Sequence, residues 1–361
     1  AFKLQIVATG MHLSSEFGST YKEIEADGFK IAKKIRVLST QDSAVAITKS
    51  ISLGCAGFAD AFKSLNPDMV IVLGDRFEIF AAAISAFIAN IPIIHLHGGE
   101  LTEGLIDDAI RHSITKMSLL HFVSTEVYRR RVIQLGEEPN RVFNVGALGI
   151  DNIRNLDYIS KKDLERNLNF EFGAKSILVT FNPVTLEKRS SKVHFMEILS
   201  ALEARKDLRV IFTMPNSDTD GRIIIKLIHN FVKNNSQRAV VFVSLGRVRY
   251  LSTLKYIDVV LGNSSSGIIE TPSFKKPTIN IGDRQRGRLK AGNVIDCLSK
   301  TPAILAALNK VFSAEFKRRC GNLKNPYGDG RTAKRIVRII ERKQKVITEM
   351  KKKFFDIKFN I

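Results

Sequence analysis

Short apolar runs alternate regularly with longer segments of helical spacing along this chain, and few folds accommodate such a pattern. In the first part of the sequence, the apolar runs predict strands at residues 4–9, 69–73, 91–96, 119–124 and 141–146. The intervening segments predict helices near residues 44–64, 77–89, 106–117 and 125–135. Strands that are apolar along their whole length and separated by helices are typical of a parallel sheet covered on both faces.

The alternation pauses and then restarts in the second part of the chain. The polar stretch 151–174 interrupts it, and we interpret this stretch as a linker. Beyond it, apolar runs predict strands at residues 176–181, 209–214, 239–244, 258–261 and 277–282. Two such series in 361 residues predict an α/β protein with two Rossmann-like domains facing each other across a cleft. We place the first domain at residues 1–160 and the second at residues 161–335.

The formal net charge of +20 has two interpretations. A basic protein can bind nucleic acid or an anionic membrane, or it can carry a lysine-rich surface around an anion-binding site. Much of the charge lies in residues 331–353, where isoleucine and valine recur at helical spacing and predict an amphipathic helix with a solvated basic face. Aromatic residues do not interleave with these cations as they do in single-strand binders. We therefore predict no nucleic-acid partner.

Cysteine usage and the absence of long apolar runs predict a cytoplasmic location. Cys55, Cys297 and Cys320 lie far apart without paired spacing, which is typical of a reducing compartment and gives no metal cluster. No apolar run reaches the roughly 18 residues that span a bilayer, so we predict no membrane partner. The first residues lack the charged and apolar regions of a secretory signal.

Titratable residues gather in two loops of the first domain. In parallel sheets ligands bind at the carboxyl ends of the strands. The motif GDRFE places Asp75 and Arg76 at such a strand end. There a carboxylate can act as a general base and an arginine can pair with a phosphate. The alternative for Asp75 is that it merely caps the following helix. The next loop is dense in such groups: His95, His97, Glu100, Glu103, Asp107, Asp108, Arg111 and His112. We interpret this density as a site rather than ordinary capping, and not as a metal site, because no spacing of metal ligands suggests one.

The second domain carries features of a phosphate site. GNSSSGIIE follows a predicted strand, and its hydroxyls on Ser264, Ser265 and Ser266 at a helix start predict a cradle for a diphosphate. Glu270 would repel a phosphate but can accept hydrogen bonds from a ribose diol, and Arg284 follows the next strand. The sequence has no GxxxxGK[ST] loop and no GxGxxG loop, which argues against an ATPase and a dehydrogenase.

Six motifs occur along the chain in this order: GDRFE, HLHGGE, DDAIRHSITKMS, FNPVT, PNSDTDG and GNSSSGIIETPSF…INIGDRQRGR. Together they resemble the hydrolysing UDP-N-acetylglucosamine 2-epimerases of bacterial sialic and legionaminic acid synthesis. The resemblance covers nearly the whole chain. It implies a GT-B-like fold whose C-terminal basic helix, at residues 336–361, packs back on the first domain. It also implies a role in the synthesis of capsule or surface polysaccharide.

The chemistry that the resemblance implies has two steps. A base removes the C2 proton of the sugar while UDP leaves C1, and water then adds to the resulting glycal, so that UDP and a free 2-epimeric sugar are released. The substrate is UDP-N-acetylglucosamine or UDP-2,4-diacetamido-2,4,6-trideoxy-glucose, and the products are UDP and N-acetylmannosamine or its diacetamido analogue. No cofactor and no metal are implied, and relatives form homodimers or homotetramers.

Individual residues carry the resemblance. The positions that match catalytic residues are Asp75, His97, Asp107 and Asn182. At His97 many relatives have a glutamate, and at Asn182, in FNPVT, the family pattern reads His-Pro. The positions that match substrate-binding residues are His12, Arg76, Asn216, Ser264, Ser265, Glu270 and Arg284, with Glu270 on the ribose.

Two departures from the family pattern keep alternatives open. The sequence begins with Ala1 at what matches the family's second strand, so we expect the first strand–helix unit to be lacking. Asn182 has no proton to exchange near neutral pH. One alternative is a degenerate homologue that binds a UDP-sugar without turnover. The other is a GT-B glycosyltransferase, against which the HGGE…DD cluster counts.

Overall fold

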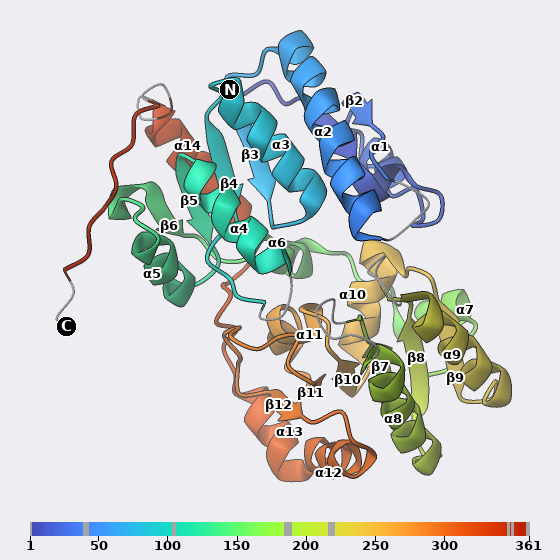
Figure 1. The fold of residues 1–361 in the computed structure, drawn as a ribbon. Coiled ribbons are helices and arrows are strands. Elements are labelled where there is room, and N and C mark those ends of the chain that lie inside the picture. The colour runs from blue at the N-terminus through green and yellow to red at the C-terminus, as the bar shows by residue number, and fades with distance from the viewer. Residues whose placement is uncertain are drawn as a thin grey trace. The chain divides into compact units, whose positions relative to one another are not determined.

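The computed structural model describes residues 2–38, 43–102, 106–183, 190–215, 221–344, 347 and 350–358. The chain forms two compact units (Figure 1). The first comprises residues 1–100, 106–146 and 333–361, and the second comprises residues 101–105 and 147–332. The chain therefore returns to its first unit near its C-terminus.

The first unit contains two parallel sheets. One pairs β1 (Ile6–Thr9) with β2 (Ile31–Ile35). The other has the order β3-β4-β5-β6, with bounds Val70–Leu73, Ile93–Leu96, Leu120–Val123 and Val142–Asn144. The central strands β4 and β5 are buried at every position, whereas Ile71 and Leu73 of β3 are half exposed. A strand in this unit is thus covered only where helices lie on both faces.

Helices of the first unit begin and end at ordinary capping residues. At α2 (Ala44–Leu65), the hydroxyl of Ser43 accepts a hydrogen bond from the amide of Ala46, and Asn66 ends the helix in a left-handed conformation. The remaining helices are α1 (Tyr21–Ala26), α3 (Phe77–Ile88), α4 (Ile106–Met117), α5 (Glu126–Gln134) and α14 (Thr332–Arg342), with 3-10 turns η1 (Gly10–Leu13) and η2 (Pro139–Arg141). Residues 350–358 form no regular secondary structure.

The second unit is built on one six-stranded parallel sheet with the order β12-β11-β10-β7-β8-β9. Its strands are β7 (Ser176–Thr180), β8 (Arg209–Thr213), β9 (Ala239–Phe242), β10 (Val259–Gly262), β11 (Thr278–Ile281) and β12 (Val294–Cys297). Its helices are α6 (Leu148–Asn155), α7 (Lys161–Leu168), α8 (Ser190–Ala204), α9 (Gly221–Asn234), α10 (Gly246–Tyr256), α11 (Ser266–Ile269), α12 (Thr301–Val311) and α13 (Ala314–Gly321), with the 3-10 turn η3 (Thr271–Phe274). This strand order is that of a doubly wound sheet.

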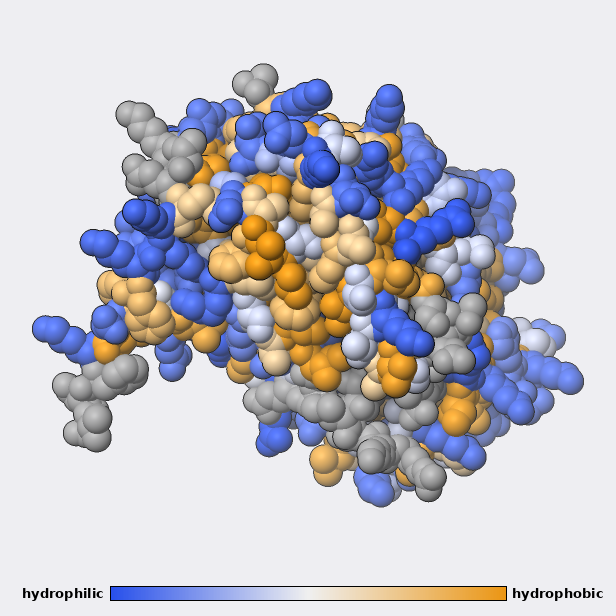
Figure 2. Space-filling view, turned by 45° about the horizontal axis from the view of Figure 1, so that its top comes forward, coloured by the Kyte–Doolittle hydropathy of each residue, from blue (hydrophilic) through white to orange (hydrophobic). Residues whose placement is uncertain are grey.

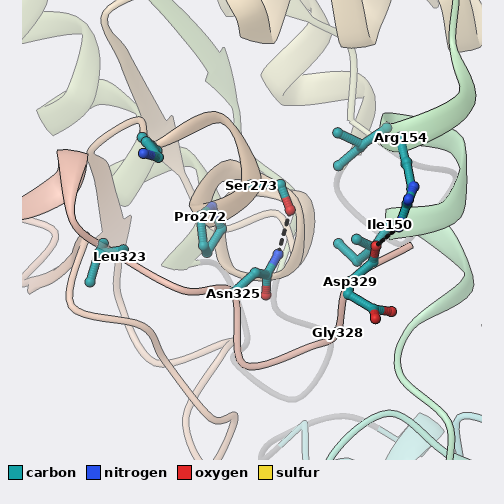
Figure 3. Close-up of a pocket in the computed structure, with 10 residues that line it drawn as sticks. Ile150, Arg154, Pro272, Ser273, Leu323, Asn325, Gly328 and Asp329 are labelled. Carbon is teal, nitrogen blue, oxygen red and sulfur yellow. Dashed lines mark hydrogen bonds between the residues drawn. The ribbon is translucent and has the colours of Figure 1, made fainter. Parts of the chain in front are cut away.

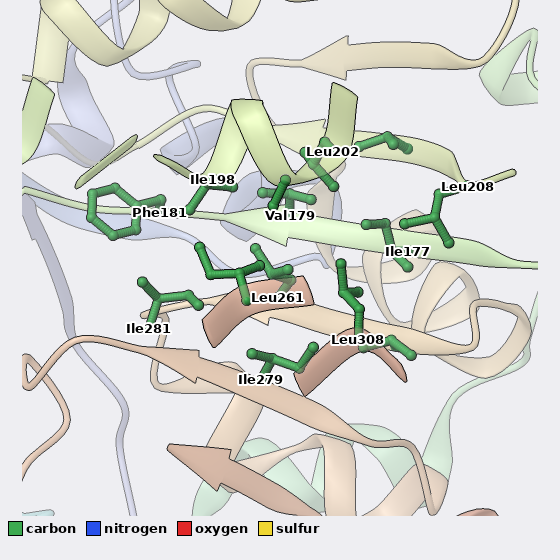
Figure 4. Packing of buried hydrophobic residues seen from close by; sticks show 14 of the residues in the cluster. Ile177, Val179, Phe181, Ile198, Leu202, Leu208, Leu261, Ile279, Ile281 and Leu308 are labelled. Carbon is green, nitrogen blue, oxygen red and sulfur yellow. The ribbon is translucent and has the colours of Figure 1, made fainter. Parts of the chain in front are cut away.

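The core of the second unit forms where α8 and α12 cover this sheet. Ile177 and Val179 of β7 and Leu261 of β10 are fully or almost fully buried and pack in one cluster with Ile198 and Leu308 (Figure 4). Apolar side chains on one face of successive strands meet the apolar faces of the helices, which is how a doubly wound sheet buries its surface.

All ten strands predicted from apolar runs are present, each within two residues of its predicted bounds. The α/β class with two Rossmann-like units is confirmed. The predicted linker at 151–174 is wrong, because α6 and α7 occupy much of it. Leu164 and Leu168 of α7 are buried one turn apart, and the hydroxyl of Ser160 caps the helix. The strands β2 and β12 were not predicted.

Among the described residues, one helix, α2, is long and apolar enough to cross a membrane by length and composition alone. Core helices share these properties, and α2 packs Phe58 and Phe62 against Ala81 and Ala82 of α3. Figure 2 shows apolar surface, in orange, among hydrophilic side chains on one face of the molecule. Apolar atoms contribute more than half of the surface of ordinary folded proteins, so neither feature by itself indicates a membrane partner.

Candidate functional site

A network of ion pairs in the first unit centres on Arg111 of α4. Its side chain is almost completely buried, and its guanidinium contacts the carboxylate of Asp75. The Nη1 atom donates to Asp108 Oδ1 at 3.1 Å and to the carbonyl oxygen of Glu100 at 2.7 Å. A buried arginine requires such compensation, because an unpaired buried charge is costly. Arg111 therefore holds the loop after β3, the loop after β4 and the first turn of α4 together.

Asp75 and Arg76 lie in the loop between β3 and α3, as the sequence predicts. Arg76 is the N-cap residue of α3, and its Nε donates to Glu78 Oε1 at 3.4 Å. Glu78 is buried, and its other oxygen, Oε2, has no hydrogen-bond partner among the residues that the structure describes. The simple capping interpretation of Asp75 is not supported, because its carboxylate pairs with Arg111 and α3 is capped at Arg76.

His97 directly follows β4 and contacts a second carboxylate. Its Nδ1 lies 2.8 Å from Glu100 Oε1, and both side chains are largely buried. His95, two residues earlier, faces the interior: its Nε2 donates to the carbonyl of Gly74 at 2.9 Å. Burial lowers the pKa of His95 to about 3, so its ring is neutral and braces the residue before Asp75. The two histidines therefore have different surroundings, because His97 lies beyond the end of β4 with a positive φ, whereas His95 lies within the strand.

Asp107 and Asp108 stand in the first turn of α4, where the helix dipole favours acids. Asp107 is half buried. Asp108 pairs with Arg111, and its Oδ2 lies 3.6 Å from His112 Nε2. Burial lowers the pKa of His112, which favours a neutral ring. The network thus joins Asp75 and His97 through Arg111 and Glu100, and it reaches the helix that carries Asp107.

His12 contacts Thr20 rather than a member of this network. It belongs to η1, its side chain is exposed, and its Nδ1 lies 2.7 Å from the hydroxyl of Thr20. Glu103 and Asn216, two further residues singled out from the sequence, lie outside the described residues. No group of three or more His, Cys, Asp or Glu side chains that could hold a metal occurs in the part of the chain that the structure describes.

In the second unit, the predicted residues Asn182 and Arg284 meet at Asn263. The side chain of Asn263 accepts from the backbone amide of Asn182 and donates to its backbone carbonyl, both at 2.7 Å. Arg284 Nη1 and Gln285 Nε2 donate to the backbone carbonyl of Asn263, at 3.3 Å and 2.9 Å. The roles of Asn263 and Gln285 could not be predicted from the sequence, because the residues that these contacts join are 81 and 22 positions apart.

The backbone of β10 approaches β7 closely just before the serines. Gly262 has φ +140°, and a Cβ atom there would lie 1.8 Å from the carbonyl oxygen of Thr180. Only glycine fits such a position. This contact sets where Asn263 and the serine stretch leave the sheet.

The three serines do not share one role. Ser264 and Ser265 are partly exposed before α11, and Ser264 Oγ accepts from the amide of Ser266 at 3.4 Å. The hydroxyl of Ser266 instead donates to Glu270 Oε2 at 2.5 Å and contacts the hydroxyl of Tyr250. Of the three serines of the predicted cradle, the hydroxyl of Ser266 is thus engaged by Glu270, whereas Ser264 and Ser265 are partly exposed without that contact.

Glu270 and Tyr250 are partly buried. Burial raises the pKa of Glu270, and the hydrogen bond from Ser266 offsets part of this rise. Burial and the nearby Glu270 carboxyl group raise the pKa of Tyr250, so the phenol keeps its proton. The order of donation is then Tyr250 to Ser266 to Glu270, and Glu270 is oriented by a chain of hydroxyls.

A separate pocket of about 270 Å³ lies in the second unit (Figure 3). Its polar groups are bound to one another: Asn325 Nδ2 donates to Ser273 Oγ at 2.7 Å, and Arg154 Nη1 donates to the carbonyl of Asp329 at 3.2 Å. Its described lining includes none of the residues predicted to bind substrate. We therefore assign it no part in the site.

Comparisons with known proteins show which family this chain is similar to. A family described as UDP-N-acetylglucosamine 2-epimerase matches residues 1–341. A "GDP/UDP-N,N'-diacetylbacillosamine 2-epimerase (hydrolyzing)" from Campylobacter jejuni is 46% identical over 98% of this chain and 91% of that protein. "Polysialic acid biosynthesis protein P7" from Escherichia coli is 40% identical over 98% of this chain and 90% of that protein.

Solved structures show the same fold at lower identity. The UDP-GlcNAc 2-epimerase from Neisseria meningitidis, in a structure with UDP-GlcNAc, superposes with a TM-score of 0.79 at 18% identity. The match covers 94% of this chain and 100% of that one. At this identity the likeness establishes the fold alone.

Proposed function

This chain belongs to the UDP-N-acetylglucosamine 2-epimerase family, and on that premise we propose that it hydrolyses a UDP-sugar with inversion at C2. One observation in the structure carries the proposal. Arg111 and Glu100 join Asp75 and His97, two of the four residues that match catalytic positions, although Asp75 and Arg111 are 36 positions apart. Such convergence of titratable groups at the ends of β3 and β4 is typical of acid–base sites in parallel sheets.

The proposed reaction proceeds in two balanced steps. A base in the first unit takes the C2 proton, the C2–H electrons form the C1=C2 double bond, and the C1–O bond breaks with its electrons leaving on UDP. Water then adds its hydroxyl to C1 while an acid delivers a proton to the opposite face of C2. Asp75, His97 and Asp107 are the groups we assign to these proton transfers, which are typically worth 10²–10⁴-fold each.

Binding of the nucleotide is assigned mainly to the second unit. Ser264, Ser265 and Arg284 supply donors for the diphosphate, and Glu270 accepts from the ribose diol. Arg76, His12 and Asn216 complete the proposed substrate contacts. The amide of Asn182 is assigned to hydrogen bonding rather than to proton transfer, since it does not titrate near neutral pH.

The sugar we favour is the UDP-linked 2,4-diacetamido-2,4,6-trideoxy sugar. The relative named for a diacetylated bacillosamine nucleotide is 46% identical, and the relative named for polysialic acid synthesis is 40% identical. UDP-N-acetylglucosamine is the second candidate, and the product would feed synthesis of an acidic surface sugar.

Incubation of the 361-residue chain with each UDP-sugar in D₂O, followed by NMR, tests the proposal. We expect UDP to appear together with a free, C2-deuterated, 2-epimeric sugar, and the faster substrate to be the diacetamido one. A GDP-linked sugar serves as the nucleotide control. Binding of the UDP-sugar without UDP release or C2 exchange would instead establish the degenerate homologue, and transfer of the sugar to an added acceptor with no epimer would establish a glycosyltransferase.

A cytoplasmic homo-oligomer completes the proposal. Cys55, Cys297 and Cys320 are free thiols, which fits a reducing compartment. Light scattering on the purified protein will give the oligomeric state, for which we expect a dimer or tetramer. A mass corresponding to 40.4 kDa would contradict that expectation.

A further inference from the structure

The turn after β4 holds His97 in an unusual backbone conformation. His97 has φ +65°, a region that residues other than glycine rarely adopt. Its amide donates to the carbonyl of Phe122 in β5 at 2.9 Å. Gly99 follows with φ +77°, and a Cβ there would lie 2.5 Å from the carbonyl oxygen of Tyr128. Neighbouring strands and α5 therefore impose the turn, and the direction of the His97 ring with it.

The contact between His97 and Glu100 determines which ring nitrogen carries the proton. Nδ1 of His97 lies 2.8 Å from Oε1 of Glu100. A carboxylate oxygen accepts hydrogen bonds, so Nδ1 is the donor, and a ring that carries one proton then presents Nε2 as the proton acceptor. The side chain of Glu100 is 5% exposed and that of His97 is 17% exposed, so water competes little for this contact.

Glu100 is itself held from two sides. The hydroxyl of Ser124 donates to Glu100 Oε1 at 3.2 Å, and Arg111 donates to the Glu100 carbonyl at 2.7 Å. The same guanidinium contacts Asp75. Arg111 thus ties the backbone of Glu100 to the carboxylate of Asp75, and Ser124 contacts the Glu100 carboxylate itself. Such an arrangement is what a preorganised acid–base pair requires.

We propose that Glu100 is a positioning residue that fixes His97 with Nδ1–H towards Glu100 and Nε2 towards the reacting proton at C2. Resting on the proposed function, this makes a histidine–carboxylate dyad the proton-transferring group. A carboxylate base has no tautomer to select and needs no such partner. A histidine base does, because the wrong tautomer presents an N–H where an acceptor is required.

Kinetics of Glu100→Gln in the complete chain test the catalytic role. We expect kcat to fall roughly tenfold or more with KM within about twofold, because the ring loses its fixed tautomer while the nucleotide contacts remain. Glu137→Gln is the matched control: Glu137 is a buried carboxylate that accepts from His121 Nε2 at 3.0 Å and lies outside the network. Its kcat should stay within twofold of the wild type.

A double variant separates positioning from folding. In a His97→Glu background the base is a carboxylate, so Glu100→Gln should cost no further activity and should relieve repulsion between two acids. Equal losses in both backgrounds would overturn the proposal and leave Glu100 with a purely structural role. Thermal denaturation of every variant shows whether any loss reflects unfolding.

The tautomer can be read without turnover. Long-range ¹H–¹⁵N spectra, with the His97 signals assigned by their absence in His97→Gln, should show the Nδ1–H form in the wild type and a shift towards Nε2–H in Glu100→Ala. An Nε2–H ring in the wild type would refute the dyad even if the enzyme is active. A wild-type chain that releases no UDP would overturn the proposed function and the catalytic part of this inference, while the spectra would still decide whether Glu100 holds His97.

Discussion

The two units differ in the kind of polar group that they bring together. In the first unit, the groups around Arg111 carry charge: Asp75, Asp108 and the His97–Glu100 pair. In the second unit, Asn263 joins its neighbours through amides, and Tyr250 reaches Glu270 through hydroxyls. Groups that exchange protons suit chemistry, and neutral donors and acceptors suit holding a ligand. We therefore expect damage to the first unit to lower kcat and damage to the second to weaken binding.

The sheets differ as well. The second unit has an unbroken sheet of six strands, and the residues of β7 in its middle are almost all buried. In the first unit the strands divide into a pair and a group of four, and β3, at the end of its group, leaves Ile71 and Leu73 half exposed. A strand in a parallel sheet is buried on both faces only where neighbours and helices surround it. The charged network lies at the ends of β3 and β4. Of these two strands, β3 is partly exposed and β4 is buried.

The largest effect is expected from Arg111→Met. Removing the guanidinium leaves the carboxylates of Asp75 and Asp108 without their buried partner, so we expect about 3–5 kcal/mol less stability and no detectable turnover. Urea denaturation and UDP release measure the two effects. Arg129→Met is the control, because Arg129 bonds the carbonyls of Val142 and Pro139 outside the network. Similar losses in both variants would show that the network is only structural.

Asp75→Asn tests the chemistry with little change in shape. The amide keeps hydrogen bonds but cannot take a proton, so we expect kcat to fall by roughly 10²–10⁴-fold and the affinity for UDP to stay within about threefold. Asp163→Asn, at an exposed carboxylate that contacts Ser160 and Arg166, should leave both unchanged. A rise in KM with unchanged kcat would break the division of roles between the units.

In the first unit, we expect the free energy of unfolding to fall at acidic pH because of Glu137. Burial raises the pKa of Glu137, but the hydrogen bond from His121 and the ammonium groups of Lys116 and Lys352 outweigh this and hold the pKa at about 2. A lowered folded-state pKa stabilises the protein above the unfolded value, near 4.5, and this contribution is lost as the pH falls from about 4.5 to 2.

The difference in unfolding free energy between the wild type and Glu137→Gln measures this effect. It should be on the order of 2 kcal/mol at pH 6 and should shrink steadily as the pH falls through that window. Glu203→Gln, at an exposed carboxylate of the second unit, should show little difference at any pH. A difference that does not change with pH would mean that Glu137 contributes packing rather than charge.

The smallest effect is expected from Glu270→Gln in the second unit. Loss of a charged acceptor for the ribose diol should weaken UDP binding about tenfold, measured by calorimetry, with kcat little changed. Glu197→Gln is the control in the same unit, because Glu197 accepts from the backbone amide of Thr301. Unchanged UDP affinity in Glu270→Gln would show that the chain from Tyr250 to Glu270 serves only the fold.

Much of the fold could be predicted because its cause is local. Apolar residues at strand spacing and helix spacing mark the ten predicted strands and the helices between them, and their partners in the core follow from that pattern. The strands β2 and β12 were missed for a physical reason: IAKKI and VIDC are short and partly polar, and each lies at the edge of its sheet, where burial does not select apolar residues. The polar surfaces of α6 and α7 hid two helices in the same way.

The sequence by itself determined the fold class and family of this protein, and the residue types gathered at the strand ends. Only the tertiary structure decided which of those residues act together. Arg111 meets Asp75 from 36 positions away, Asn263 meets Asn182 from 81 positions away, and Ser266 turns from the serine stretch to Glu270. Periodicity reports which face of an element is buried, whereas a hydrogen bond between distant residues depends on how strands stack and where they end. That information exists only once the sheets have formed.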